Sequence, residues 1–152
     1  MRLATMKFSA SQTTAKVVDQ LCAGLGLPRR DLNLNEGASL GPQDCLIAAF
    51  PVFSGRLPAF FKVWMDQIQG RDTPAVAVVV YGNRAYEDAL LELSDALEAG
   101  GFTVVGAAAV VAQHSIFPAV ANGRPDAADA AGIANFAQTL LEKGLDAAHP
   151  MT

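Results

Sequence analysis

Four hydroxyl side chains lie close together near the start of the chain and could bind an anion; they are Ser9, Ser11, Thr13 and Thr14. They follow an apolar run at residues 3–8 and reach into residues 13–25, where apolar side chains recur at helical spacing. Hydroxyls donate hydrogen bonds, and the start of a helix adds unpaired N–H groups and a partial positive charge. The segment has no lysine, so it does not match the phosphate loop of nucleotide triphosphatases. The pattern predicts a site for a phosphate-bearing cofactor that is held without a metal ion.

Two aromatic side chains follow two further apolar runs. Phe53 lies after Pro51 and shortly before Gly55, and Tyr86 lies shortly after Gly82. A planar heterocycle can stack between two aromatic rings, and glycine permits a close approach of the backbone. The alternative for Phe53 is that its ring only covers the edge of a sheet.

Arg84 and His114 each have two interpretations. Arg84 is either a ligand contact or a solvated surface charge. His114, which follows the last apolar run, is either a proton donor or a loop residue without a chemical role. Asp126 is interpreted as the cap of the last helix.

No hydrolase constellation is predicted, and the dinucleotide fingerprint G-x-G-x-x-G does not occur in the sequence. The two cysteines, Cys22 and Cys45, lack the spacing of a metal or iron–sulfur site. Both lie in apolar segments, so they are predicted to be small buried side chains in a reducing compartment.

Apolar runs that alternate with helical patterns predict the fold. The runs show no clean alternation with polar residues, which is typical of strands buried on both faces of a parallel sheet. We therefore expect an α/β three-layer sandwich with a five-stranded parallel sheet. The predicted strands are residues 3–8, 45–50, 75–81 and 104–112, with a short one near 31–34; the predicted helices are residues 13–25, 58–69, 86–100 and 126–143.

The loops that follow these strands are expected to meet at one edge of the sheet, where ligands bind in such folds. Residues 35–43 are too few for a helix with its connections, so the second crossover is predicted to be shortened to a loop. One domain is predicted over residues 1–146, with a frayed tail at 147–152.

Composition limits the partners that we expect. The net charge is −4 and 17% of residues are charged. A mildly acidic chain does not suggest nucleic acid or an anionic membrane as a partner. The sequence also shows no leader pattern and no membrane-spanning run, so a cytoplasmic location is expected.

The three segments, taken in order, resemble those of flavodoxins over nearly the whole chain. Ser9-Ala10-Ser11-Gln12-Thr13-Thr14 is similar to the flavodoxin phosphate loop, Ser/Thr-x-Thr-Gly-x-Thr. Residues 50–58 and 81–86 look most like a subgroup of flavodoxin-like domains, some of which are fused to a ferredoxin-type module that this chain lacks. The resemblance implies noncovalent FMN, the strand order 2-1-3-4-5 and electron transfer.

The resemblance also implies positions around FMN. Hydroxyls would bind the phosphate, while Phe53 and Tyr86 would flank the isoalloxazine ring and neighbouring backbone would contact its polar edge. It implies no catalytic side chain and no metal ligand. The implied cofactor-binding residues are Ser9, Ser11, Gln12, Thr13, Thr14, Pro51, Val52, Phe53, Ser54, Gly55, Gly82, Asn83, Arg84 and Tyr86.

The sequence departs from the flavodoxin pattern at three places. Gln12 occupies the glycine position of the phosphate loop, and Phe53 replaces a more usual Tyr or Trp. Asn83 and Arg84 stand where flavodoxins often carry an acid. The first departure, Gln12, predicts weaker FMN binding. The last, Asn83 and Arg84, predicts that the flavin is reduced fully more readily than in acidic flavodoxins.

The leading prediction is an FMN-binding flavodoxin-like protein that mediates electron transfer with an unknown redox partner, as a monomer or a homodimer. One alternative is a flavodoxin-fold interaction module in which FMN binding is weak or lost. The other is an FMN-dependent reductase with a small substrate over the flavin, to which His114 would be close.

Overall fold

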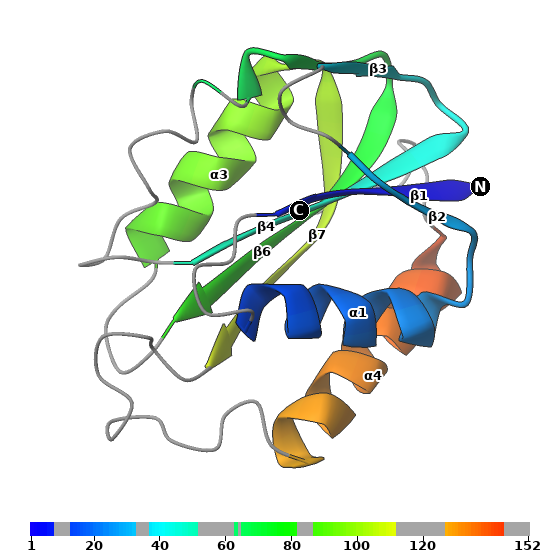
Figure 1. Cartoon of the computed structure of the whole chain (residues 1–152), viewed down its shortest axis with the longest axis vertical. Coiled ribbons are helices and arrows are strands. Elements are labelled where there is room, and N and C mark those ends of the chain that lie inside the picture. Colours follow the sequence, from blue (N-terminus) through cyan, green and yellow to red (C-terminus); the bar gives the residue numbers. More distant parts are fainter. Residues whose placement is uncertain are drawn as a thin grey trace.

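A sheet of five strands runs through the middle of the molecule (Figure 1). The computed structural model describes residues 1–7, 13–32, 37–51, 63, 65–81, 87–111 and 127–144. The strands of the sheet are β1 (Arg2–Lys7), β2 (Arg29–Asp31), β4 (Asp44–Pro51), β6 (Thr73–Tyr81) and β7 (Phe102–Val111). They lie in the order β2-β1-β4-β6-β7, and every neighbouring pair is parallel. Numbered along the chain within this sheet, the order is 2-1-3-4-5, which confirms the prediction.

Helices cover both faces of the sheet, so the molecule has three layers. Helices α1 (Thr13–Leu25) and α4 (Ala127–Lys143) lie side by side on one face, and α3 (Glu87–Ala99) lies on the other (Figure 1). Val63 and Met65 are also helical. The predicted three-layer α/β sandwich is therefore confirmed.

The apolar strands are explained by burial on both faces. On β4, Leu46 and Phe50 belong to the core under α3, whereas Cys45 and Ile47 belong to the core under α1 and α4. All four side chains are at most 1% exposed. Since successive strand residues point to opposite faces, a strand with a helix layer on each side needs apolar residues throughout.

A second, smaller sheet was not predicted. It pairs β3 (Ala38–Leu40) with β5 (Ile68–Gly70) in parallel. The shortened crossover at residues 35–43 is thus not only a loop. The last four residues of the helix predicted over 58–69 are not helical, since residues 66 and 67 form a turn and residues 68 and 69 belong to β5. The strand expected near 31–34 also begins earlier, at Arg29.

The small sheet covers the core under α3 at the amino ends of the main strands. Leu40 and Ile68 are each 1% exposed within that core. The hydroxyl of Thr73 donates to the carbonyl oxygen of Leu40 at 3.0 Å, which ties the small sheet to the start of β6. Ile68, whose spacing suggested that it belonged to the helix predicted over 58–69, is instead a buried residue of β5.

Glycines follow the ends of helices α1 and α4. The N–H of Gly26 donates to the carbonyl oxygen of Cys22 at 3.0 Å after α1, and Gly144 ends α4 in the same way with Leu140. Both glycines have positive φ, a conformation that glycine adopts at less cost than other residues. Among the helices that the structure describes, none is long and apolar enough to cross a membrane.

Candidate functional site

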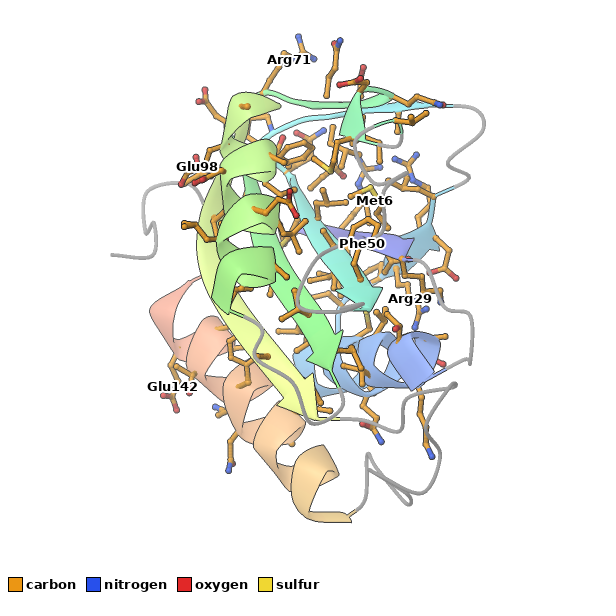
Figure 2. The ribbon with its side chains drawn as sticks, turned by 90° about the vertical axis from the view of Figure 1, so that its left-hand side faces the viewer. Met6, Arg29, Phe50, Arg71, Glu98 and Glu142 are labelled. Atoms are coloured by element: carbon orange, nitrogen blue, oxygen red, sulfur yellow. The ribbon has the colours of Figure 1, made fainter. Side chains whose placement is uncertain are left out.

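The carboxyl ends of four neighbouring strands define one edge of the main sheet, called here the carboxyl edge. Its last strand residues are Lys7 on β1, Pro51 on β4, Tyr81 on β6 and Val111 on β7. Figure 2 shows the arrowheads of β4, β6 and β7 pointing to the same end of the molecule. The sequence segments that follow these strands therefore begin at this edge, as expected.

The structure describes three of the predicted cofactor-binding residues. Thr13 is the first residue of α1, and Thr14 follows it in the first turn and is 2% exposed. Pro51 was predicted to begin a loop, but it is the last residue of β4 and lies in register with Val80 of β6. The others lie outside the described residues, as do His114 and Asp126; they are Ser9, Ser11, Gln12, Val52, Phe53, Ser54, Gly55, Gly82, Asn83, Arg84 and Tyr86.

Helix α1 is held firmly against its surroundings, which fixes the position of its first turn. Its apolar stripe is buried against the sheet, with Val17, Val18 and Leu21 each at most 1% exposed. On its flank, a Cβ added to Gly24 would lie 2.8 Å from the Cβ of Ala137 on α4, so the two helices touch closely. The first turn contains no acidic side chain, so its N–H groups can face an anion without a competing carboxylate.

A polar network joins β1, β2 and α1 on the α1 face of the sheet. The hydroxyl of Thr5 donates to Oδ1 of Asp31, and Nε of Arg29 donates to the same oxygen at 2.9 Å. Nη1 of Arg29 lies 2.7 Å from Oδ1 of Asp19 on α1. Figure 2 shows Arg29 beside α1. The hydrogen bond from Thr5, helped by Arg29, lowers the pKa of Asp31, so this carboxylate stays charged.

Lys7 stands at the carboxyl edge and was missed by the sequence reasoning. It is half-buried at the end of β1. Its charge helps to lower the pKa of Asp31 and acts on Cys22 of α1, so it belongs to the α1 face. The signal was available, because Lys7 is two residues from Thr5 and directly precedes the hydroxyl-rich segment.

Solved structures of other proteins share this architecture. A flavodoxin from the domain Archaea superposes with a TM-score of 0.67 over 94% of this chain and 98% of its own, at 14% sequence identity. Two-electron reduced Megasphaera elsdenii flavodoxin superposes with a TM-score of 0.62 over 91% of this chain and 99% of its own, at 15% sequence identity.

The chain has the flavodoxin-like fold. The apo form of an NADH:FMN oxidoreductase also superposes on it, with a TM-score of 0.62 over 98% of this chain and 93% of that one, at 16% identity. No protein-family model matches the chain, and no curated protein matches it in sequence. At these identities the likeness concerns the fold, and one fold can carry several functions.

The thiols of this flavodoxin-like chain are structural. Cys22 and Cys45 are both free and buried in the core under α1 and α4. Burial raises the pKa of both thiols, that of Cys45 to about 12, so neither is a reactive thiolate at neutral pH. No group of three or more potential metal ligands lies together in the described part of the chain.

One serine motif in the sequence was overlooked, and the structure explains why it is not catalytic. Residues 37–41 read Gly-Ala-Ser-Leu-Gly, which matches the G-x-S-x-G spacing of hydrolases. That motif acts as a sharp turn between a strand and a helix. Here Ser39 is the middle residue of β3 and pairs in register with Gln69, far from the carboxyl edge (Figure 1).

Proposed function

We propose that this chain is an FMN-binding flavodoxin-like protein that transfers electrons. The observation that carries the proposal is the junction between β1 and α1. The first turn of α1 begins shortly after the carboxyl end of β1, it has no acidic side chain, and the intervening sequence is rich in hydroxyls. This donor set suits a phosphate group.

Hydroxyl residues at the start of α1 would hold the phosphate of FMN. The isoalloxazine ring would then extend along the carboxyl edge toward the segments after β4 and β6. Ring-flanking residues in this proposal are Phe53 and Tyr86, and the hydroxyl donors are Ser9, Ser11, Thr13 and Thr14. Bound FMN supplies the redox chemistry, whereas the protein controls its binding, its orientation and its electrostatic surroundings.

The test of FMN binding is direct. Titrating the purified protein with FMN should quench flavin fluorescence and should raise the midpoint of thermal unfolding, because a ligand that binds only the folded state stabilises it. A protein that stays colourless after FMN addition and removal of excess ligand, and that gains no thermal stability, would contradict the proposal. That result would favour the alternative of an interaction module that has lost FMN.

A reductase is the second candidate function, favoured by the likeness to an NADH:FMN oxidoreductase. The two candidates differ in what reduces the flavin. An electron carrier needs a redox protein, whereas a reductase accepts hydride from a nicotinamide directly. Mixing the FMN-loaded protein with NADH or NADPH under anaerobic conditions and following flavin bleaching distinguishes them. Bleaching within seconds favours the reductase, and its absence favours the carrier.

A further inference from the structure

The two edge strands of the main sheet differ in length and in charge. At one edge, β2 has only three residues, Arg29–Asp31, and all of them are charged. At the other edge, β7 has ten residues, and Phe102–Val111 contains neither a charged residue nor a proline. Short and charged edge strands resist pairing with another chain, whereas a long apolar one offers it a row of N–H and C=O groups. The β7 edge therefore lacks the protection that the β2 edge has.

A bulge divides β7 into two parts. The register between β6 and β7 shifts at this point, because Ala75 pairs with Val104 and Val76 pairs with Gly106. A bulge bends and twists the strand locally, which disfavours pairing of that part with another strand. From Gly106 to Val111 the register with β6 is unbroken. The regular part of the edge is therefore residues 106–111.

The apolar side chains of this regular part are less buried than their neighbours on β6. Residues 77–79 of β6 are at most 1% exposed, whereas residues 107–109, which pair with them, are all partly exposed. The partly exposed ring of Phe136 on α4 lies over Gly106, since a Cβ added there would be 3.4 Å from its Cζ. In the part of the chain that the structure describes, no strand lies beyond β7 (Figure 2, yellow). The edge thus presents an apolar band with an aromatic ring beside it.

A second copy of this chain is the partner that fits the β7 edge. Two copies related by a twofold axis present the same strand to each other in antiparallel directions. Self-pairing of β7 brings no like charges together, because the strand has none, whereas self-pairing of β2 would oppose its charged side chains. The small side chains of residues 107–109 let the two strands and the helices beside them approach closely.

The size of the contact agrees with a dimer of modest affinity. Helices α3 and α4 both contact β7, one on each face of the sheet, so all three layers reach this side of the molecule. Six strand residues span about 20 Å, and a sheet between two helix layers is about 30 Å thick, which gives a contact of about 600 Å² on each copy. The total of about 1,200 Å² is at the lower end of the range for specific interfaces.

We propose that the chain forms a twofold homodimer in which residues 106–111 of β7 pair antiparallel with the same residues of a second copy. The axis lies near Ala108, and the two main sheets become one continuous sheet. The contact runs along the side of the sheet, so each copy keeps its own carboxyl edge accessible. The inference goes beyond the proposed function and does not depend on flavin binding.

Sedimentation equilibrium of the full chain from about 1 to 100 μM should show a concentration-dependent dimer, as expected for a small interface. Ala108→Lys and Ala108→Glu each place like charges across the axis, and each should weaken the dimer at least about tenfold. An equal mixture of the two variants should restore it, because the charges are then opposite. Arg30→Glu on the β2 edge is the control and should leave the dimer unchanged.

Ala108→Cys tests the geometry without adding a charge. Residues opposite each other in antiparallel strands have Cα atoms about 4.5–5.5 Å apart, which a disulfide spans. Glutathione disulfide should therefore yield a covalent dimer of Ala108→Cys but not of Leu91→Cys, at an exposed position on α3, since the native thiols are buried.

Three results would overturn the inference, and all of them leave the proposed function intact. They are a monomer at 100 μM, a dimer that neither charged variant weakens, and an Ala108→Cys variant that forms no covalent dimer. Hydrogen exchange of such a monomer identifies the alternative, because slow exchange at residues 106–111 would show that the chain covers its own edge.

Discussion

Gln12 stands where the flavodoxin phosphate loop has glycine. If FMN binding requires a left-handed backbone at residue 12, that conformation costs a non-glycine residue about 1–2 kcal/mol. Gln12→Gly should therefore tighten FMN binding about tenfold, since 1.4 kcal/mol corresponds to a factor of ten. Calorimetric titration with FMN measures the change, and Ala10→Gly controls for added flexibility in the same segment. Equal affinity in wild type and Gln12→Gly would mean that residue 12 does not need the left-handed conformation.

In the resemblance to flavodoxins, Arg84 falls at a position where those proteins often carry an acid, and the proposed function places this position near the flavin. Negative charge near the ring disfavours the anionic reduced flavin, and a neighbouring cation favours it. Arg84→Glu should make the potential of the second one-electron reduction more negative than in wild type. Spectroelectrochemical titration of the FMN-loaded protein measures both potentials, with Arg71→Glu as the control at the other end of the molecule. An unchanged second potential would place Arg84 among solvated surface charges.

Asp31 gives stability a defined pH dependence. The Thr5 hydroxyl and then Arg29 lower its pKa in the folded chain. A carboxyl whose pKa is lower in the folded chain than in the unfolded chain stabilises the protein at pH values above its pKa in the unfolded chain, which is about 3.9. This contribution to stability is lost as the pH falls through the pKa of the folded chain. Asp31→Asn should lower the free energy of unfolding at pH 7 by less than about 1 kcal/mol, because the side chain is partly exposed. The difference should shrink below pH 4.

Urea unfolding of wild type and Asp31→Asn at pH 7 and pH 3 measures this dependence. Asp95→Asn, at an exposed position on α3, serves as the matched control. A loss of stability that is the same at both pH values would mean that the Asp31→Asn substitution acts through packing and not through charge.

Among the elements, the contact between α1 and α4 depends on a small residue. Gly24→Ala should gain up to about 1 kcal/mol of helix propensity, but its Cβ would lie 2.8 Å from that of Ala137. Overpacking of a fitted interface costs about 1–3 kcal/mol, so the net effect should be destabilising. Gly132→Ala on α4 has nothing within 4 Å of its new Cβ and should instead stabilise by about 0.5–1 kcal/mol.

Thermal and urea unfolding should show a lower stability for Gly24→Ala and a higher stability for Gly132→Ala than for wild type. The double variant Gly24→Ala with Ala137→Gly should recover part of the loss, because the second change removes the atom that clashes. Stabilisation of Gly24→Ala by the same amount as Gly132→Ala would show that the helices can move apart at no cost.

Long periodic elements could be predicted from the sequence with nearly correct bounds, whereas the short strands were either displaced, as for β2, or missed. Helix α1 has the predicted bounds, because its apolar stripe and the glycine at its end agree. The small sheet of β3 and β5 was missed since three-residue strands carry no periodicity and are fixed by long-range contacts, such as that of Thr73 with Leu40.

At the scale of the whole molecule, the two helix layers make the cores inaccessible. Cys45 is 0% exposed and Cys22 is 6% exposed, on β4 and α1 of the same core. Both thiols have a raised pKa, and only the thiolate reacts with alkylating reagents. Alkylation of either thiol therefore requires that the layer of α1 and α4 opens from the sheet.

Labelling by iodoacetamide at pH 8 measures this opening. Native protein should react at least about 100-fold more slowly than protein in denaturant, because both exposure and thiolate formation are suppressed. Cys22→Ala reports on Cys45, and Cys45→Ala reports on Cys22. If α1 leaves the sheet as a unit, both thiols should react at similar rates, and bound FMN should slow both, since a ligand at the start of α1 stabilises the closed layer. Rapid reaction of Cys22 alone would instead indicate that the C-terminal half of α1 frays independently of the site at its first turn.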